Sequence, residues 1–170
     1  MITGFDKFIG EIFIPNISGY GIVDNANKDE LSAIAEVSEL DYLMKMFGEN
    51  LADDIIQAHY DSIQEGYEAT FWDELLGLLT NQRLGSPLAC YVYFRYRQNK
   101  ITETTAAGEV SLASENATVK NPTYKLVKAW NNMVMMSEKV LEYVQANSEM
   151  FVNFDQSISF PFEKINSFGI

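Results

Sequence analysis

The amino-acid sequence predicts a mainly α-helical domain of four or five helices. Hydrophobic residues recur at steps of three and four along most of the chain, which is the spacing of an amphipathic helix. Serine or asparagine followed by proline, a typical helix start, precedes two of these segments. A hydrophobic content of 47% with 21% charged residues is typical of a globular protein. A chain of 170 residues is long enough to bury roughly 70% of its unfolded surface.

The chain is organised as one domain. No internal repeat and no domain boundary are visible, so residues 1–170 form a single unit. Within this unit we distinguish an N-terminal arm (1–27), a helical core (28–146) and a C-terminal tail (147–170).

The N-terminal arm is predicted to be extended. Isoleucine and glycine are frequent in it, and Glu11 to Ile14 favour a short extended piece that Pro15 ends. The glycines and the polar run 24–27 that follow favour a loop. An apolar arm without a core of its own must lie on the domain or on a neighbouring subunit. We therefore predict partner contacts in the arm at Ile12, Phe13 and Ile14.

The first helix is predicted over residues 28–47. Glu36 and Glu39 fall at its wetter positions, and Gly48 is a natural stop after its last turn. The hydrophobic residues step by threes and fours and define the expected inward face: Leu31, Ile34, Val37, Leu40, Met44 and Phe47.

Two further helices are predicted before residue 83. Thr70, followed three residues later by Asp73, resembles a capping box for a short helix over 71–82, which Trp72 is expected to anchor in the core. Asn50 is the expected cap of the helix before it, whose inward face comprises Leu51, Ile55, Ile56 and Tyr60.

The segment 86–97 is ambiguous by composition. Its unbroken apolar run and its aromatic residues favour a strand. Ser86 as a cap and Pro87 at the first helical position favour a helix, which is our prediction. Because such a helix is apolar nearly all round, it must be central and covered by neighbours, with Tyr91 as a core anchor.

The clearest helix spans residues 122–146. Asn121 can cap it, and Pro122 suits its first position. Trp130 is expected to anchor this helix in the core, and the helix is expected to pack antiparallel to 86–97 at the centre of the fold. Its hydrophobic stripe comprises Val127, Trp130, Val134, Leu141 and Val144.

Residues 98–121 are predicted to form a long polar loop. A loop of this length is uncommon in a compact domain and is usually functional or mobile. A hairpin around Gly108 is the alternative to irregular structure, and a floppy insertion is the alternative to a binding or assembly role. The contacts expected for such a role are Thr104, Thr105, Gly108, Glu109 and Val110.

The C-terminal tail is predicted to dock on the domain or on a partner. A disordered tail rarely carries so many aromatic residues with so little charge. The residues concerned are Phe151, Phe154, Phe160, Phe162 and Phe168.

The net charge of −12 argues against several classes of partner. It disfavours an electrostatic grip on nucleic-acid phosphates and on anionic membranes. No run of about 18 apolar residues is present to span a membrane, and the first residues lack the features of a signal peptide. We therefore expect a cytoplasmic protein in which the single cysteine, Cys90, is a buried and inert thiol.

No residue pattern predicts catalysis, a cofactor site or a metal site. His59 is the only histidine, and a reactive or metal-binding histidine needs converging partners. The acidic pairs 53–54 and 36/39 match no calcium loop and are typical of solvated helix faces. Triad order, phosphate-binding loop and paired-cysteine motifs are all missing. We therefore expect no enzyme activity and no small-molecule substrate.

Several short motifs between residues 10 and 146 carry a family resemblance. In chain order they are Ile-Pro-Asn (14–16), Tyr-Leu-Met-Lys-Met-Phe-Gly (42–48), the Trp72–Leu79 helix, Tyr-Val-Tyr-Phe (91–94), Thr-Thr (104–105), Gly-Glu-Val (108–110), Glu-Asn-Ala (115–117) and Lys-Ala-Trp-Asn-Asn-Met (128–133). With this layout the chain resembles the small helical proteins encoded among the head genes of tailed phages and prophages. Those proteins are related to the head–tail connector, or head-completion adaptor, family.

The resemblance implies a non-enzymatic structural subunit of a virion that closes into a homo-oligomeric ring beneath the portal. The long loop and the N-terminal arm would contact neighbouring subunits or tail proteins, and an acidic lumen would let DNA slide past. The family has no catalytic residues to carry over. The alternative is a small helical interaction or regulatory domain of a bacterial cell that holds a partner peptide with its 98–121 loop.

Overall fold

The computed structural model describes residues 1–165 except 18, 20, 106–107, 112–122 and 156, with the backbone alone between 101 and 123. The described part is mainly helical, which confirms the predicted fold class. Five α-helices and one two-stranded hairpin follow two short 3-10 turns, Phe5–Lys7 and Gly10–Ile12. These elements are α1 (Ile22–Phe47), α2 (Glu49–Ser62), α3 (Trp72–Thr80), α4 (Pro87–Ile101), β1 (Thr102–Thr105), β2 (Gly108–Ser111) and α5 (Thr123–Ala146).

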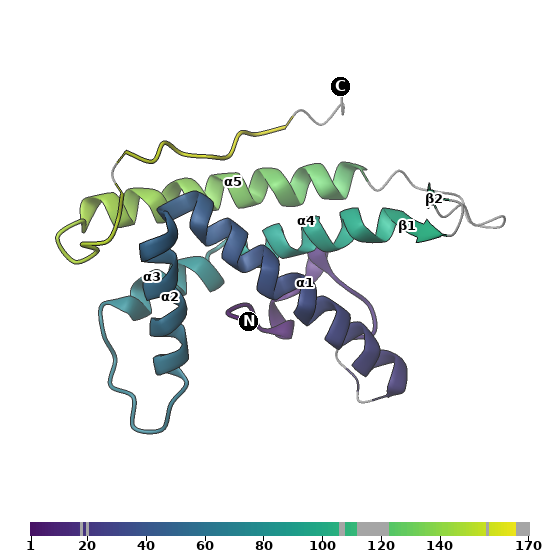
Figure 1. The fold of residues 1–170 in the computed structure, drawn as a ribbon, viewed down its shortest axis with the longest axis horizontal. Coiled ribbons are helices and arrows are strands. Elements are labelled where there is room, and N and C mark those ends of the chain that lie inside the picture. The colour runs from purple at the N-terminus through teal and green to yellow at the C-terminus, as the bar shows by residue number, and fades with distance from the viewer. Residues whose placement is uncertain (18, 20, 106–107, 112–122, 156, 166–170) are drawn as a thin grey trace.

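Helices α4 and α5 lie antiparallel at the centre of the fold, as the sequence predicted (Figure 1). Helix α1 crosses α4 on the other side, and α2 and α3 form a limb below the central pair. The first seven residues of α4 after its opening proline include no exposed side chain, so the segment that composition left ambiguous is a helix covered by its neighbours.

The start of α4 is fixed by Ser86. Its hydroxyl oxygen accepts a hydrogen bond from the Ala89 amide at 2.9 Å and donates one to the Leu79 carbonyl at 3.0 Å. The same side chain therefore caps α4 and joins it to the end of α3. This confirms the cap that the Ser-Pro pair predicted.

Helix α1 begins at Ile22 and not at residue 28. The polar run 24–27 is helical because Asp24 accepts a hydrogen bond from the Gly21 amide at 3.2 Å and places an acidic group at the helix N-terminus. Residues that favour a turn in isolation thus serve here as the first turn of a helix.

The junction between α1 and α2 is shorter than predicted. Helix α2 starts at Glu49, directly after Gly48, so Asn50 lies inside the helix and does not cap it. Gly48 has a φ of 82°, which only glycine adopts at little cost, and this lets the chain reverse within one residue. The capping box of α3 is confirmed: Asp73 accepts from the Thr70 amide at 2.6 Å, and the Thr70 hydroxyl oxygen accepts from the Trp72 amide at 3.3 Å.

The N-terminal arm is held to α1 by Glu39. The sequence placed this residue on a wet face, yet its side chain is buried at 3% exposure. Its two carboxylate oxygens accept hydrogen bonds from the backbone amides of Ile2 and Thr3, both at 2.7 Å. A buried carboxylate is costly unless such donors satisfy it, so the arm and the charge stabilise each other.

The middle of the arm is a 3-10 turn over Gly10–Ile12 and not the extended piece predicted for 11–14. Ile12 and Ile14 enter the core, whereas Phe13 between them is exposed. The turn lets two isoleucines that are two positions apart fill the space beside α4 and α5.

The C-terminal tail packs along the helices, as predicted. Phe162 is buried beside aromatic rings of three helices, with ring centroids 5.5 Å from Tyr42, 5.7 Å from Tyr91 and 5.8 Å from Trp130. The Trp130 indole donates to the Glu163 carbonyl at 2.7 Å, which fixes the tail over α5. Phe168 lies outside the described residues.

The three expected core anchors differ in burial. Tyr91 is buried, and its hydroxyl donates to Asp41 at 2.5 Å. Trp72 and Trp130 are only partly buried: Trp72 packs against Phe151 of the tail, and Trp130 contacts Phe94 of α4 and Phe162 of the tail. Both tryptophans pack against the core, as expected of anchors, and part of each side chain remains exposed.

The segment after α4 is an antiparallel hairpin. Helix α4 continues to Ile101, so the first four residues of the expected loop are helical. Strands β1 and β2 then pair in the register Thr102 with Ser111 and Thr105 with Gly108. The rest of the expected loop, residues 112–121, lies outside the described residues.

Replacement of Glu39 by alanine should lower the free energy of unfolding by about 2 kcal/mol, because two buried amides lose charged acceptors. Urea denaturation measures this loss, and limited proteolysis should show earlier cleavage of the arm. Glu36→Ala removes an exposed carboxylate one turn away and serves as the control. Equal stability of the two variants would show that the Glu39 hydrogen bonds do not hold the arm.

Replacement of Phe162 by alanine should cost about 3 kcal/mol of unfolding free energy, because it removes the ring between Tyr42 and Trp130. Calorimetry measures the change, and the tryptophan emission should shift to the red. Val152→Ala, at an exposed position of the same tail, should leave both readings unchanged. A Phe162→Ala protein as stable as the parent would show that the tail does not contribute to the core.

Candidate assembly surface

The histidine and the neighbouring acidic residues of α2 form no cluster of reactive side chains in the described part of the chain. His59 is half-buried on α2 beside Glu36 and Glu39, and the Glu39 carboxylate is already bonded to the arm. Asp53 is exposed, and Asp54 accepts a hydrogen bond from the Asn153 amide group of the tail at 2.7 Å. Among the residues that the structure describes, no group of three or more histidine, cysteine, aspartate or glutamate side chains is placed to hold a metal ion.

Cys90 is buried in α4. Burial away from water disfavours the thiolate and, with the nearby charge of Glu11, raises the pKa of the Cys90 thiol to about 12. At neutral pH the side chain is therefore a neutral thiol packed against its neighbours.

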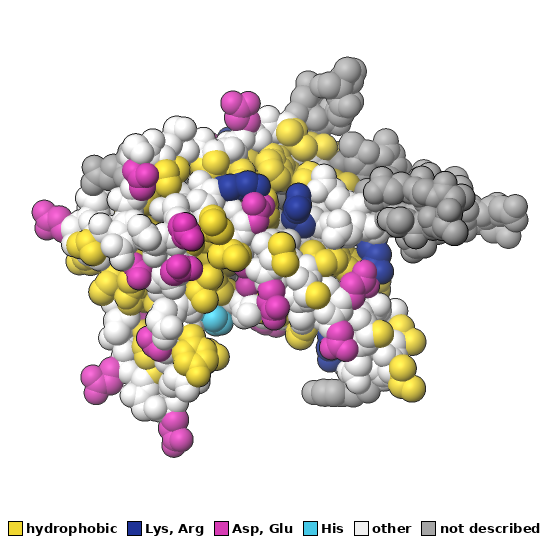
Figure 2. Space-filling model, in the orientation of Figure 1, with side chains coloured by type: hydrophobic (Ala, Val, Ile, Leu, Met, Phe, Trp, Pro, Cys, Tyr) yellow, Lys and Arg dark blue, Asp and Glu magenta, His cyan; other side chains and the backbone are white. Residues whose placement is uncertain are grey.

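A hollow with mostly apolar walls lies between α1 and α2, with Met1 and Ile2 of the N-terminal arm in its lining. This α1–α2 groove has a volume of about 360 Å³. Figure 2 shows this hollow between α1 and the limb formed by α2 and α3, with hydrophobic side chains and the histidine at its edge. Tyr60 at its rim is 58% exposed, although the sequence placed this residue on an inward face. The residues that line the groove are Met1, Ile2, Glu36, Glu39, Leu40, Ile56, His59, Tyr60 and Ile63.

The outer side of α1 is apolar and exposed next to this groove. Val37, Leu40 and Met44 lie three and four residues apart on one face, and Val37 is 68% exposed. The sequence assigned all three to the inward face, which is wrong. The helix carries hydrophobic residues on more than one face, and Leu31, Leu43 and Phe47 already fill the side that meets the core.

A second hollow borders the exposed outer side of α1, between α1 and α4. It measures about 250 Å³ and is lined by residues of α1 and α4, among them Ile34, Val37 and Arg95. The exposed outer side of α1 is thus flanked by one hollow toward α2 and another toward α4. Contiguous exposed apolar surface of this kind usually marks an interaction site.

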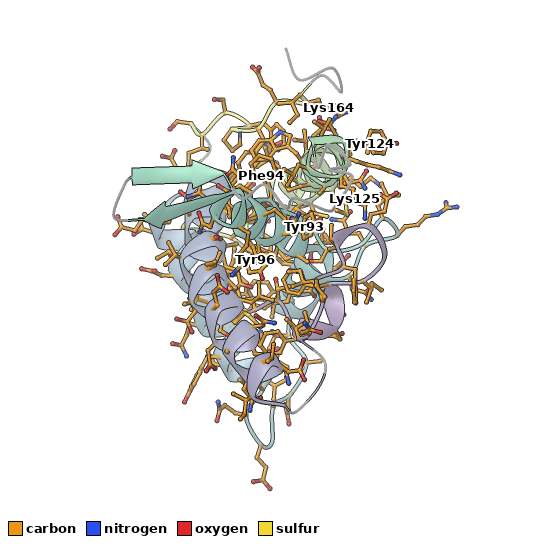
Figure 3. All side chains as sticks on the ribbon, turned by 90° about the vertical axis from the view of Figure 1, so that its right-hand side faces the viewer. Tyr93, Phe94, Tyr96, Tyr124, Lys125 and Lys164 are labelled. Carbon is orange, nitrogen blue, oxygen red and sulfur yellow. The ribbon has the colours of Figure 1, made fainter. Side chains whose placement is uncertain are left out.

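Charge is distributed unevenly between the two ends of the molecule. Residues 22–80, which include α1 to α3, carry fourteen acidic side chains and two lysines, whereas the rest of the chain is balanced. Exposed basic and aromatic groups gather at the start of α5, where Figure 3 shows Tyr124, Lys125 and Lys164 at one end of the molecule. We call these three residues the basic end.

The predicted contact residues are only partly available to a partner. Ile12 and Ile14 belong to the core, so the prediction that they contact a partner is wrong, whereas Phe13 is exposed. The hairpin brings Thr104 opposite Glu109, Thr105 opposite Gly108, and Val110 opposite Glu103. Sequence reasoning missed the α1–α2 groove, although the surplus of hydrophobic residues on 28–47 was a signal for it.

Comparison of the chain with protein families, with curated proteins and with solved structures finds no match. None of the helices in the described part of the chain has the length and apolar character needed to cross a membrane.

In the native protein, Cys90 should react with a thiol reagent far more slowly than a free cysteine at mildly alkaline pH, because its raised pKa leaves almost no thiolate. Absorbance of the released chromophore measures the rate. Full reaction should follow when denaturant is added, which supplies the internal control. Rapid stoichiometric reaction of the folded protein would contradict the burial.

Proposed function

We propose that this protein is a non-enzymatic structural subunit of a phage or prophage virion, a head–tail connector or adaptor that forms a ring beneath the portal. The motif resemblance supports this proposal, and the compact helical fold with one hairpin is compatible with it. In this proposal the chain works through its surfaces and binds neither a cofactor nor a small-molecule substrate.

The observation that carries the proposal is the exposed apolar face formed by α1 and α2. Val37, Leu40 and Met44 are exposed on α1, and Leu40 lines the groove together with Ile56 and Ile63, which are also exposed. Water contact with such a patch is unfavourable, whereas contact with a second protein removes it from water. A subunit that functions inside an assembly has a physical reason to carry this face.

The hairpin supports the same conclusion. It extends α4 beyond the helical body (Figure 1). An isolated two-stranded hairpin is only marginally stable in water, and contact with another protein would stabilise it. Thr104, Thr105, Gly108, Glu109 and Val110 are therefore retained as candidate contacts to a neighbouring subunit, the portal or a tail protein.

The charge of the chain agrees with a passage for DNA. The acidic excess of residues 22–80 repels phosphates, so a ring that turned these residues inward would let DNA pass without holding it. Specific binding of nucleic acid is not part of the proposal.

A small helical interaction or regulatory domain of a bacterial cell is the second candidate. The α1–α2 groove favours it, because a groove with apolar walls between two helices can receive the apolar face of a partner helix. The two candidates differ in where the protein is found: a connector subunit remains in purified virions, and a regulatory domain does not.

The test uses Val37→Asp, with Val152→Asp as a matched control at an exposed position of the tail. Virions are purified after complementation with each variant, and the amount of the protein in them is measured by mass spectrometry. Co-purification of each variant with the portal protein of the same genome is measured in parallel. We expect Val37→Asp to lose incorporation roughly tenfold or more, since a charge is buried in the interface, while its melting temperature stays unchanged. Val152→Asp should assemble as the parent does. Absence of the parent protein from virions and from portal complexes would overturn the proposal.

A further inference from the structure

The α1–α2 groove is both apolar and acidic at its border. Glu36 lines the groove, and Asp53 is exposed on α2, three residues before the groove residue Ile56. Fourteen of the 24 acidic residues of the chain fall between residues 22 and 80. A partner surface that fits this groove must offer an apolar anchor together with positive charge.

The groove is poorly suited to pair with itself. In a twofold dimer the same patch faces its own copy, so the two acidic surfaces of α1 and α2 would be brought together. Juxtaposed like charges oppose association by several kcal/mol in general. A contact between two copies is therefore expected to join the groove to a different surface of the neighbour.

The basic end supplies the complementary chemistry. Tyr124 is 64% exposed in the first turn of α5, and Lys125 follows it, also exposed. A tyrosine combines a large apolar ring with a polar hydroxyl, which suits a groove lined by Ile56 and Leu40 with His59 at its side. No acidic residue occupies the first turn of α5, so the positive end of the helix dipole adds to the charge of Lys125.

Lys164 belongs to the same end of the molecule. The residues on either side of it are bonded to α5: the Trp130 indole donates to the Glu163 carbonyl, and Asn131 bonds the backbone of Ile165. The docked tail therefore places a second exposed lysine over the first half of α5 (Figure 3).

The groove and the basic end lie on different sides of the subunit. The groove is lined by residues of α1 and α2, which Figure 1 shows below the central helices, whereas the start of α5 lies at the right-hand end of that pair. When two copies join through the groove of one and the basic end of the other, one groove and one basic end remain free on the dimer. Such contacts continue until a ring closes or a filament grows.

Resting on the ring function proposed above, we propose that the α1–α2 groove of one subunit receives Tyr124 and Lys125 of a second copy of this chain. Tyr124 enters between Leu40 and Ile56, and Lys125 and Lys164 face the acidic border formed by α1 and α2. The occupant of the groove is thus the basic end of the next subunit.

The decisive experiment places cysteines on both surfaces. Because Cys90 is buried, Tyr60→Cys at the groove and Glu163→Cys beside Lys164 introduce the reactive thiols, and both variants keep Tyr124 in place. Each variant alone, a mixture of the two, and the double variant are treated with a short bismaleimide. This is done on the free protein and on complexes with the portal protein of the same genome, followed by denaturing electrophoresis.

The proposal expects a distinct pattern. The mixture should yield cross-linked dimers only, the double variant should yield a ladder of higher multimers, and each single variant should remain monomeric. Dimers of Tyr60→Cys alone would show that the groove pairs with itself, which overturns the proposal. Monomers in every sample overturn it as well.

Charge reversal provides an independent reading. Lys125→Glu should weaken self-association roughly tenfold, and combination with Glu36→Lys should restore it, because the pair is then reversed and not removed. Lys139→Glu makes the same charge change at an exposed site elsewhere on α5 and should have no effect. Equal weakening by Lys125→Glu and Lys139→Glu would show a general charge effect and overturn the specific contact.

The mass of the complexes, measured by mass photometry, separates this proposal from the ring function itself. Oligomers that form without the cross-link leave the ring function intact and overturn only this contact. Absence of oligomers, both free and on the portal protein, overturns both.

Discussion

The structure depends on the burial of α4. From Leu88 to Tyr93 every side chain of this helix is buried, so this part of the helix has no side that faces water. Helix α5 covers one side and α1 crosses another, while the N-terminal arm and the tail close the gaps that remain. A short central helix of this kind sets the size of the domain, because α1, α3 and α5 all pack against it. The ends of the chain are therefore structural parts of the core.

The polar contacts of the fold follow from that requirement. Glu39 holds the arm by its backbone amides, Ser86 joins α3 to α4, and the Trp130 indole holds the tail by a carbonyl. Each contact pairs a side chain with backbone, so an irregular segment is fixed without secondary structure of its own. Helix α1 carries more apolar residues than the core can bury. Its outer face is therefore exposed, and the proposed assembly role rests on this surplus.

Local signals along the chain were sufficient for the elements whose ends are set by neighbouring residues. The Ser86–Pro87 start and the Thr70–Asp73 capping box depend on contacts three residues apart, and both are present. The start of α1 was misplaced because Asp24 to Asn27 favour a turn and a helix start almost equally. Glu39 was misplaced because its partners are the amides of residues 2 and 3, far away in the sequence. The α1–α2 groove was missed for the same reason, since it exists only where two helices meet.

The sequence by itself determined the helical class, the central position of α4 and the docking of an aromatic tail. These properties follow from periodicity, helix caps and the need to bury aromatic rings, all of which are encoded locally. Only the tertiary structure decided which hydrophobic residues of α1 stay in water and which carboxylate is buried. It also decided that the acidic groove and the basic end lie on different sides of the subunit. A hydrophobic pattern marks residues able to leave water, whereas the packing of the other helices determines which of them do.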